Sequence, residues 1–186
     1  MCDGIAATGS TAIAVCGSEK LADYAKTQGI QAFPPKDGIV AKAGLRFLQN
    51  DPPKLVYLGL EESDGAGHSG NYPHYLSVLD RYDRYLARIW AQIEALNIAG
   101  HPTTLIVKVD HGRGRGAKWT GHRWNLPGSN QIWMFAAGHG VPQRGILQNT
   151  TTRSLYDLRP TTEHLLGMPP KTRLWGNVIA EFFPKD

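Results

Sequence analysis

Two carboxylates and three imidazoles lie in two glycine-rich segments of the sequence, SDGAGHS and the longer stretch from VDHG to GHRW. They are Asp64, His68, Asp110, His111 and His122. Carboxylate oxygen and imidazole nitrogen suit a borderline or hard divalent ion such as Zn²⁺ or Mn²⁺. Since no cysteine is near them in the sequence, a structural zinc site with thiolate ligands is disfavoured. The residue types therefore predict a catalytic metal site.

The spacing of these residues suits metal binding as well. Asp64 and His68 are four residues apart, so a single turn of the chain can present both to one ion. Asp110 and His111 are adjacent after an apolar run, so their side chains can point to different sides of a metal pair. Each motif alone is also explained by an ordinary polar turn or a surface hydrogen-bond pair. Their combination, in this order and after successive apolar runs, favours the metal site.

The elements that must position these residues follow from the hydrophobic pattern. Short, β-rich apolar segments predict strands at 11–17, 54–60, 103–109 and 131–138. The segments between them predict helices at 18–29, 37–50 and 72–97. In the last helix, apolar residues recur at steps of three and four, which gives one continuous apolar stripe. Strands that alternate with helices predict an α/β fold, with a mostly parallel sheet and helices on both faces.

Two segments that follow predicted strands are expected to be irregular loops, 61–71 and 111–130. In open α/β sheets, ligands bind beyond the carboxyl ends of the strands. Two polar loops leaving two strand ends are therefore where a site is expected. The second loop is too long to be only a connection.

Composition limits the function classes. A chain of 186 residues with 41% hydrophobic content predicts a single domain over 1–186. The net charge of +4 comes from scattered basic residues, which fits a small anionic molecule better than a nucleic-acid polymer. Cys2 and Cys16 form no metal or disulfide pattern. Neither a signal peptide nor a long apolar segment is evident, so no membrane partner is expected and localisation stays open.

Three segments resemble the second half of alkaline phosphatase superfamily metalloenzymes. They are LVYLGLEESDGAGHSGNYPHYLSVLDRYDRYLARIWAQI, TTLIVKVDHGRG and KWTGHRWNLPGSNQIWM. The branch that holds type I phosphodiesterases and nucleotide pyrophosphatases is the most similar, and phosphoglycerate mutases and phosphopentomutases are its relatives. The resemblance covers roughly residues 54–168, where DLRPTTEHLLGMPP resembles the family's late helix that ends on a glycine. It implies an alkaline-phosphatase-like core with two divalent ions, Zn²⁺ or Mn²⁺, beside a Ser or Thr nucleophile.

The resemblance also implies a division of the ligands between the two ions. Asp64, His68 and His122 match the ligands of one ion. Asp110 and His111 match part of the set for the other. The family completes that second set with an aspartate from its first strand and with the nucleophile itself.

The aspartate from the first strand and the nucleophile both belong to an N-terminal segment that has no good match in this sequence. Asp3, Thr8 and Ser10 are poor substitutes, because no apolar strand precedes them. We therefore expect a core that lacks its N-terminal part, and strand edges left open by this loss would favour self-association.

The expected function is a metal-dependent hydrolase of small phosphate or sulfate esters, of the phosphodiesterase or phosphatase type, truncated before its nucleophile segment. Arg113 and Arg115 would contact the anionic substrate, since guanidinium groups match phosphate oxygens, although solvated loop arginines explain them equally well. One alternative is a non-catalytic metal-binding remnant. Another is part of a phosphosugar or phosphoglycerate mutase, whose cap domain could not lie between His68 and Asp110. Members of the family are often periplasmic or extracellular.

Overall fold

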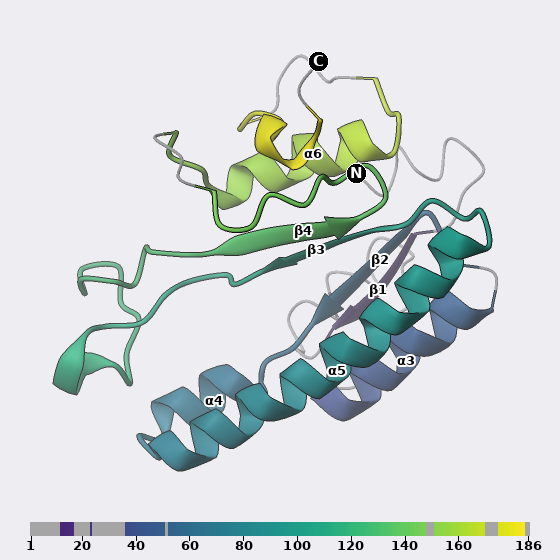
Figure 1. The fold of residues 1–186 in the computed structure, drawn as a ribbon. Helices are drawn as coiled ribbons and strands as arrows, with labels where there is room; N and C mark the ends of the chain where they lie inside the picture. The colour runs from purple at the N-terminus through teal and green to yellow at the C-terminus, as the bar shows by residue number, and fades with distance from the viewer. Residues whose placement is uncertain are drawn as a thin grey trace.

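The computed structural model describes residues 12–16, 23, 36–50, 52–147, 151–169 and 175–184. Two pairs of strands form its sheets (Figure 1). In the first pair, β1 (Ala12–Cys16) runs parallel to β2 (Leu55–Gly59). In the second, β3 (Thr104–Lys108) runs antiparallel to β4 (Met134–Gly138). The α/β fold class is confirmed, and the strands lie where the sequence pattern predicts them.

The antiparallel pairing of β3 and β4 corrects the prediction of a mostly parallel sheet for this half of the described chain. A parallel pair needs a crossover connection, usually a helix. The segment between β3 and β4 holds only the short 3₁₀ turn η1 (Gly116–Lys118). Its two ends run back along each other, with Val109 N 3.4 Å from Trp133 O. The chain therefore leaves β3 and returns at the same end, so β4 must run the other way.

Two long helices cover one side of the strands. They are α3 (Asp37–Gln49) and α5 (Tyr72–Ile98), close to the predicted ranges. The side chain of Asn71 caps the start of α5 by accepting a hydrogen bond from His74 N at 3.0 Å. The core between helices and strands is formed by buried Leu48, Ile89, Ile93 and Leu96, packed against Val56, Leu58 and Leu105. The apolar stripe predicted for the helix at 72–97 is thus confirmed in its second half.

The late helix predicted from the family resemblance is α6 (Leu158–Leu165). Gly167 follows it with φ of +65°, and Met168 N donates to Glu163 O at 2.9 Å, an arrangement that satisfies the last carbonyls of the helix. Figure 1 shows α6 on the opposite side of β3 and β4 from α5. Helices therefore lie on both sides of the strands, as predicted.

Part of the sequence prediction falls outside the described residues. The helix expected at 18–29 is described only at Asp23, and Asp3, Thr8 and Ser10 are not described. Among the helices that the structure does describe, none combines the length and the apolar character needed to cross a membrane.

Candidate metal centre

A short helix, α4 (Glu62–His68), carries the first two predicted ligands. The prediction that 61–71 is an irregular loop is wrong, because a buried group from elsewhere in the chain caps this helix. The carboxylate of Asp37, 1% exposed, accepts hydrogen bonds from Glu61 N at 3.0 Å and Glu62 N at 2.8 Å. The helical turn then places His68 Nε2 3.3 Å from Asp64 Oδ2.

Tyr82 of α5 completes the anchor of α4. Its hydroxyl donates a hydrogen bond to Asp37 and accepts one from Ser63 N at 3.0 Å. Burial, together with the hydrogen bond to Asp37, raises the pKa of Tyr82 far above its usual value, so the phenol keeps its proton. The helix with Asp64 is thus held by α3 and α5. The sequence gives no local signal for this role of Asp37, because its partners lie 24, 25 and 45 positions further on.

His111 follows β3 at its carboxyl end. Its Nδ1 lies 3.0 Å from Gly112 O, and because a carbonyl oxygen can only accept, Nδ1 is the donor. In the tautomer with the proton on Nδ1, the lone pair is on Nε2, which lies 3.9 Å from Asp64 Oδ1 and 3.6 Å from Asp110 Oδ2. A backbone contact of this kind is typical of a metal-binding histidine.

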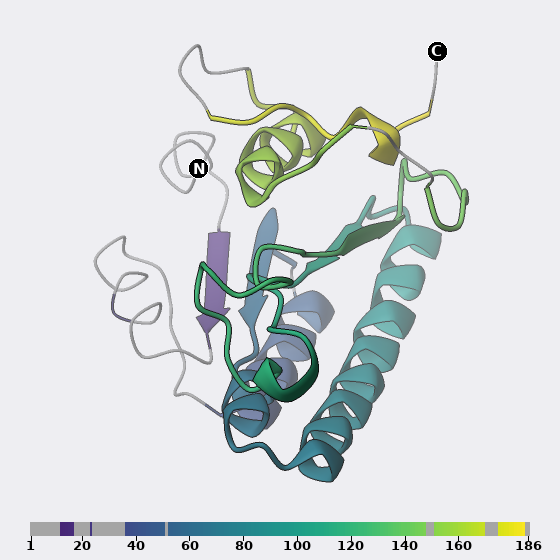
Figure 2. The same ribbon diagram turned by 90° about the vertical axis from the view of Figure 1, so that its left-hand side faces the viewer.

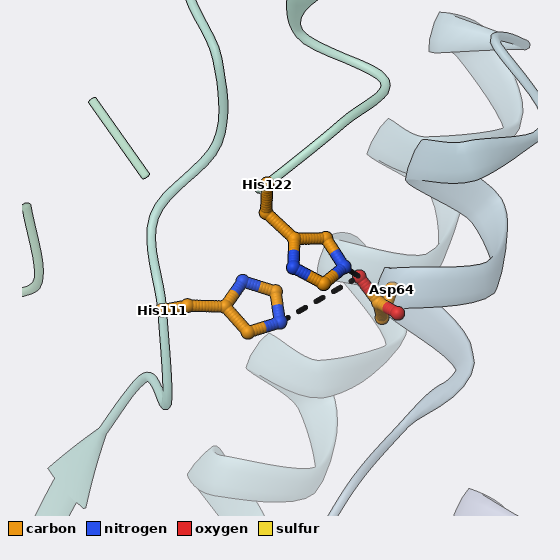
Figure 3. A group of neighbouring side chains, drawn as sticks. All are labelled: Asp64, His111 and His122. Atoms are coloured by element: carbon orange, nitrogen blue, oxygen red, sulfur yellow. Dashed lines mark ion pairs between the residues drawn. The ribbon is translucent and has the colours of Figure 1, made fainter. Parts of the chain in front are cut away.

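His122 reaches the same place from the loop between β3 and β4. Figures 1 and 2 show this loop at the same end of the molecule as α4. The His122 ring stacks on that of His111, with centroids 3.8 Å apart, and its Nε2 lies 3.5 Å from Asp64 Oδ1 (Figure 3). Burial, and then the neighbouring His111, lower the pKa of His122, so its imidazole favours the neutral state that a metal ligand needs.

Asp64, His111 and His122 form the centre of the cluster, with one ligand atom of each within 4.8 Å of the others. Two ligand atoms about 2.1 Å from a shared ion lie roughly 3.4 Å apart in tetrahedral geometry. Asp64 Oδ1 lies 3.5 Å from His122 Nε2 and 3.9 Å from His111 Nε2, so both distances are near this value. His68 adjoins this group, since its Nε2 lies 3.0 Å from that of His122. The donor set of carboxylate and imidazole therefore fits a divalent ion.

Asp110 lies at the edge of the cluster. Its side chain is 73% exposed, and His111 stands between it and Asp64. The structure thus brings all five predicted residues into one neighbourhood and gives His111 a position between the two carboxylates. The division into one ion held by Asp64, His68 and His122 and a second held by Asp110 and His111 stays a prediction.

The two arginines predicted to contact substrate have partners within the protein. The guanidinium of Arg113 donates to the side chain of Asp64 and, at 2.8 Å, to its carbonyl oxygen. Arg115 donates to Gln131 Oε1 at 2.8 Å. Contact with a substrate stays a prediction for both. The structure shows in addition that Arg113 supports Asp64.

Comparison with known proteins identifies the family. The model of the metalloenzyme superfamily matches residues 24–170, which include all five candidate ligands. The chain belongs to the metalloenzyme superfamily. This confirms the broad resemblance drawn from the sequence, and a family of this kind implies divalent metal ions. Whether they are zinc or manganese stays a prediction.

Curated relatives of this superfamily member include phosphoglycerate mutases. The 2,3-bisphosphoglycerate-independent phosphoglycerate mutase of Synechococcus sp. (strain JA-3-3Ab) is 30% identical over 135 residues, which cover 68% of this chain and 24% of the relative. The enzyme of the same name from Thermomicrobium roseum is 23% identical, over 75% of this chain and 26% of the relative. The chain thus spans about a quarter of the length of these relatives. Both are mutases, whereas the sequence analysis favoured the phosphodiesterase branch, which stays a prediction.

A solved structure supports the fold. The crystal structure of Leishmania mexicana phosphoglycerate mutase at low cobalt concentration is similar with a TM-score of 0.65, at 14% sequence identity. The similarity covers 94% of this chain and 38% of that one. The predicted alkaline-phosphatase-like core is therefore confirmed as the fold of this part of the chain.

Proposed function

We propose that this chain is the metal-holding part of a phosphoryl-transfer enzyme of the phosphoglycerate mutase type. The observation that supports this most is the convergence of Asp64, His68, His111 and His122 at the carboxyl ends of β2 and β3. The mutase relatives favour this proposal over the hydrolase of phosphate or sulfate esters that the sequence predicted. The substrate would be a small phosphate ester.

The residues of the cluster have distinct tasks in this proposal. Asp64 supplies the negative charge that neutralises a cation, and Asp110 adds a second carboxylate at the exposed edge. The contact of His111 with a backbone carbonyl orients its ring, and the lowered pKa of His122 keeps a lone pair available. When bound here, divalent ions would bind the oxygens of a phosphoryl group and stabilise the leaving oxygen.

Metal analysis tests the core of the proposal. The purified 186-residue chain is dialysed with Mn²⁺ or Zn²⁺, and the bound metal is measured. We expect retained metal in the wild type, and its loss in D64N and H122N. H101N is the matched control, because His101 is exposed and outside the cluster. No bound metal in the wild type, or metal retained in both ligand variants, would contradict the proposal.

Activity assays on the metal-loaded chain distinguish the candidate functions. Isomerisation of phosphoglycerate without 2,3-bisphosphoglycerate would support the mutase proposal. Hydrolysis of an aryl phosphate or an aryl phosphodiester without isomerisation would instead restore the predicted hydrolase. Metal binding with neither activity would fit a non-catalytic metal-binding module and, equally, a metal-holding part that needs the rest of its enzyme. H122N, which lacks one predicted ligand, should abolish whichever activity is found.

A further inference from the structure

Arg113 occupies a position between α4 and the loop that carries His122. Its side chain is only 15% exposed. Nη2 donates to the carbonyl oxygen and to the side chain of Asp64, and Nη1 donates to Thr120 O at 3.2 Å. One guanidinium therefore links a candidate metal ligand on α4 to the backbone two residues before another, His122.

Gly67 makes room for this guanidinium. A Cβ atom at Gly67 would lie 2.3 to 2.7 Å from three atoms of the Arg113 side chain. A Cβ atom at Gly65, on the same helix, would have nothing within 4 Å. Glycine in a helix interior destabilises the helix by about 1 kcal/mol relative to alanine. Gly67 therefore makes α4 less stable, but it leaves the space that the Arg113 guanidinium occupies.

Aromatic packing holds the loop against α5 on the same side. The ring of Trp119 lies 5.4 Å from that of Tyr72 and 5.6 Å from that of Tyr75, both at the start of α5. The guanidinium carbon of Arg113 lies 6.0 Å from the centre of the Tyr75 ring. Arg113 is thus enclosed by α4, α5 and the loop, and its side chain is packed against protein groups rather than solvated.

We propose that Arg113 is a positioning residue that holds Asp64 and the His122 loop in binding geometry before an ion arrives. This inference rests on the proposed role of Asp64 and His122 as metal ligands. Replacing a group that forms hydrogen bonds to a metal ligand and orients it commonly lowers metal affinity. Arginine suits the task because its planar fork makes several bonds in fixed directions, which the single ammonium of lysine cannot reproduce.

The charge of Arg113 and the geometry of its hydrogen bonds have opposite effects on metal affinity, so substitutions can separate the two. The positive charge of Arg113 repels a cation, so the charge alone weakens metal binding. R113K keeps the charge and loses the fork, so it isolates the geometric contribution. G67A keeps the arginine and displaces its guanidinium, and G65A is the matched control on the same helix.

The main measurement is the Mn²⁺ dissociation constant of each variant. We expect R113K and G67A to bind Mn²⁺ at least tenfold more weakly, within the range known for such supporting groups, and G65A to bind like the wild type. Affinity in R113K equal to or tighter than that of the wild type would overturn the inference. If G67A fails to fold, as judged by circular dichroism, R113K decides the question.

A metal-free measurement separates this inference from the proposed function. Gly114 N donates to Gly121 O at 2.8 Å across the loop that Arg113 braces. In EDTA, exchange of the Gly114 amide with solvent should be faster in R113K and G67A than in the wild type and G65A. Unchanged exchange would overturn the inference even if the wild type binds no metal. Faster exchange with unchanged Mn²⁺ affinity would overturn it too, because Arg113 would then support only the loop.

Discussion

The substitution D37N should weaken the anchor of α4. The Asp37 carboxylate is buried and accepts from Glu61 N, Glu62 N and the hydroxyl of Tyr82. Asparagine has nearly the same shape but no charge, and its NH₂ group cannot accept these hydrogen bonds. A charge-assisted hydrogen bond contributes about 1.5–3 kcal/mol and a neutral one about 0.5–1.5 kcal/mol. The difference is roughly 1 kcal/mol per bond, so three donors lose about 3 kcal/mol in total.

Thermal unfolding followed by circular dichroism measures this loss. For a domain of this size, 1 kcal/mol corresponds to about 2–4 °C, so the melting temperature should fall by about 6–12 °C. D80N is the matched control, because Asp80 is 65% exposed and, within the described part of the chain, forms an ion pair with its helix neighbour Arg84 alone. Its effect should stay near 0.5 kcal/mol. A D37N melting temperature within 2 °C of the wild type would refute this account, since roughly 1 kcal/mol or less would then be involved.

A double-substitution cycle tests whether Asp37 and Tyr82 act together. Y82F removes the hydroxyl that donates to Asp37 and accepts from Ser63 N. Both substitutions disturb the same hydrogen-bonded group. The loss in free energy of unfolding in the double variant should therefore be smaller than the sum of the two single losses, by about 0.5 kcal/mol or more. Mn²⁺ affinity should fall in D37N as well, because α4 carries Asp64. Strict additivity would indicate that the two residues support α4 independently.

Three further predictions concern the loop and the cluster. G112A should destabilise the protein and abolish metal binding. A Cβ at this position would lie 2.1 Å from Gly128 O and 2.4 Å from Gln131 O, and these backbone atoms cannot move aside easily. A melting temperature equal to that of the wild type would contradict this prediction. Burial and the nearby His111 lower the pKa of His122 below that of the unfolded chain, so protonation favours unfolding. In EDTA, the free energy of unfolding measured with urea should therefore be highest above about pH 6.5. It should fall as the pH drops below that value, and less steeply in H122N than in the wild type. Mn²⁺ at a hundredfold excess over its dissociation constant should stabilise the wild type by about 2.7 kcal/mol, and EDTA should reverse the gain.

The sequence predicted the elements whose signals are local. The strands and the long helices α3 and α5 follow from apolar runs and from apolar residues at helical steps, because each pattern reflects burial of one face. The prediction of a mostly parallel sheet does not hold for the β3–β4 pair, although the sequence shows no helical segment between these strands. Chain direction depends on where the loop returns, and that depends on contacts such as the one between Val109 and Trp133.

The candidate ligands were chosen by residue type and by their place after apolar runs. That the side chains of Asp64, His111 and His122 meet is a fact of tertiary structure, because they come from α4 and from two separate parts of the loop between β3 and β4. Residue types alone showed which ligands were available. They could not show that His111 lies between two carboxylates, since this depends on how the loop folds back.

The sequence by itself determined the class of the fold and the chemical nature of the site, because hydrophobic periodicity and donor atoms belong to the residues themselves. Only the tertiary structure decided how the site is supported. The helix at 62–68 forms because Asp37, far from it in the sequence, accepts its first amide groups. Arg113, for which substrate contact stays a prediction, lies in the space that Gly67 leaves beside Asp64. Both roles arise from contacts between distant segments, and such contacts exist only once the chain has folded.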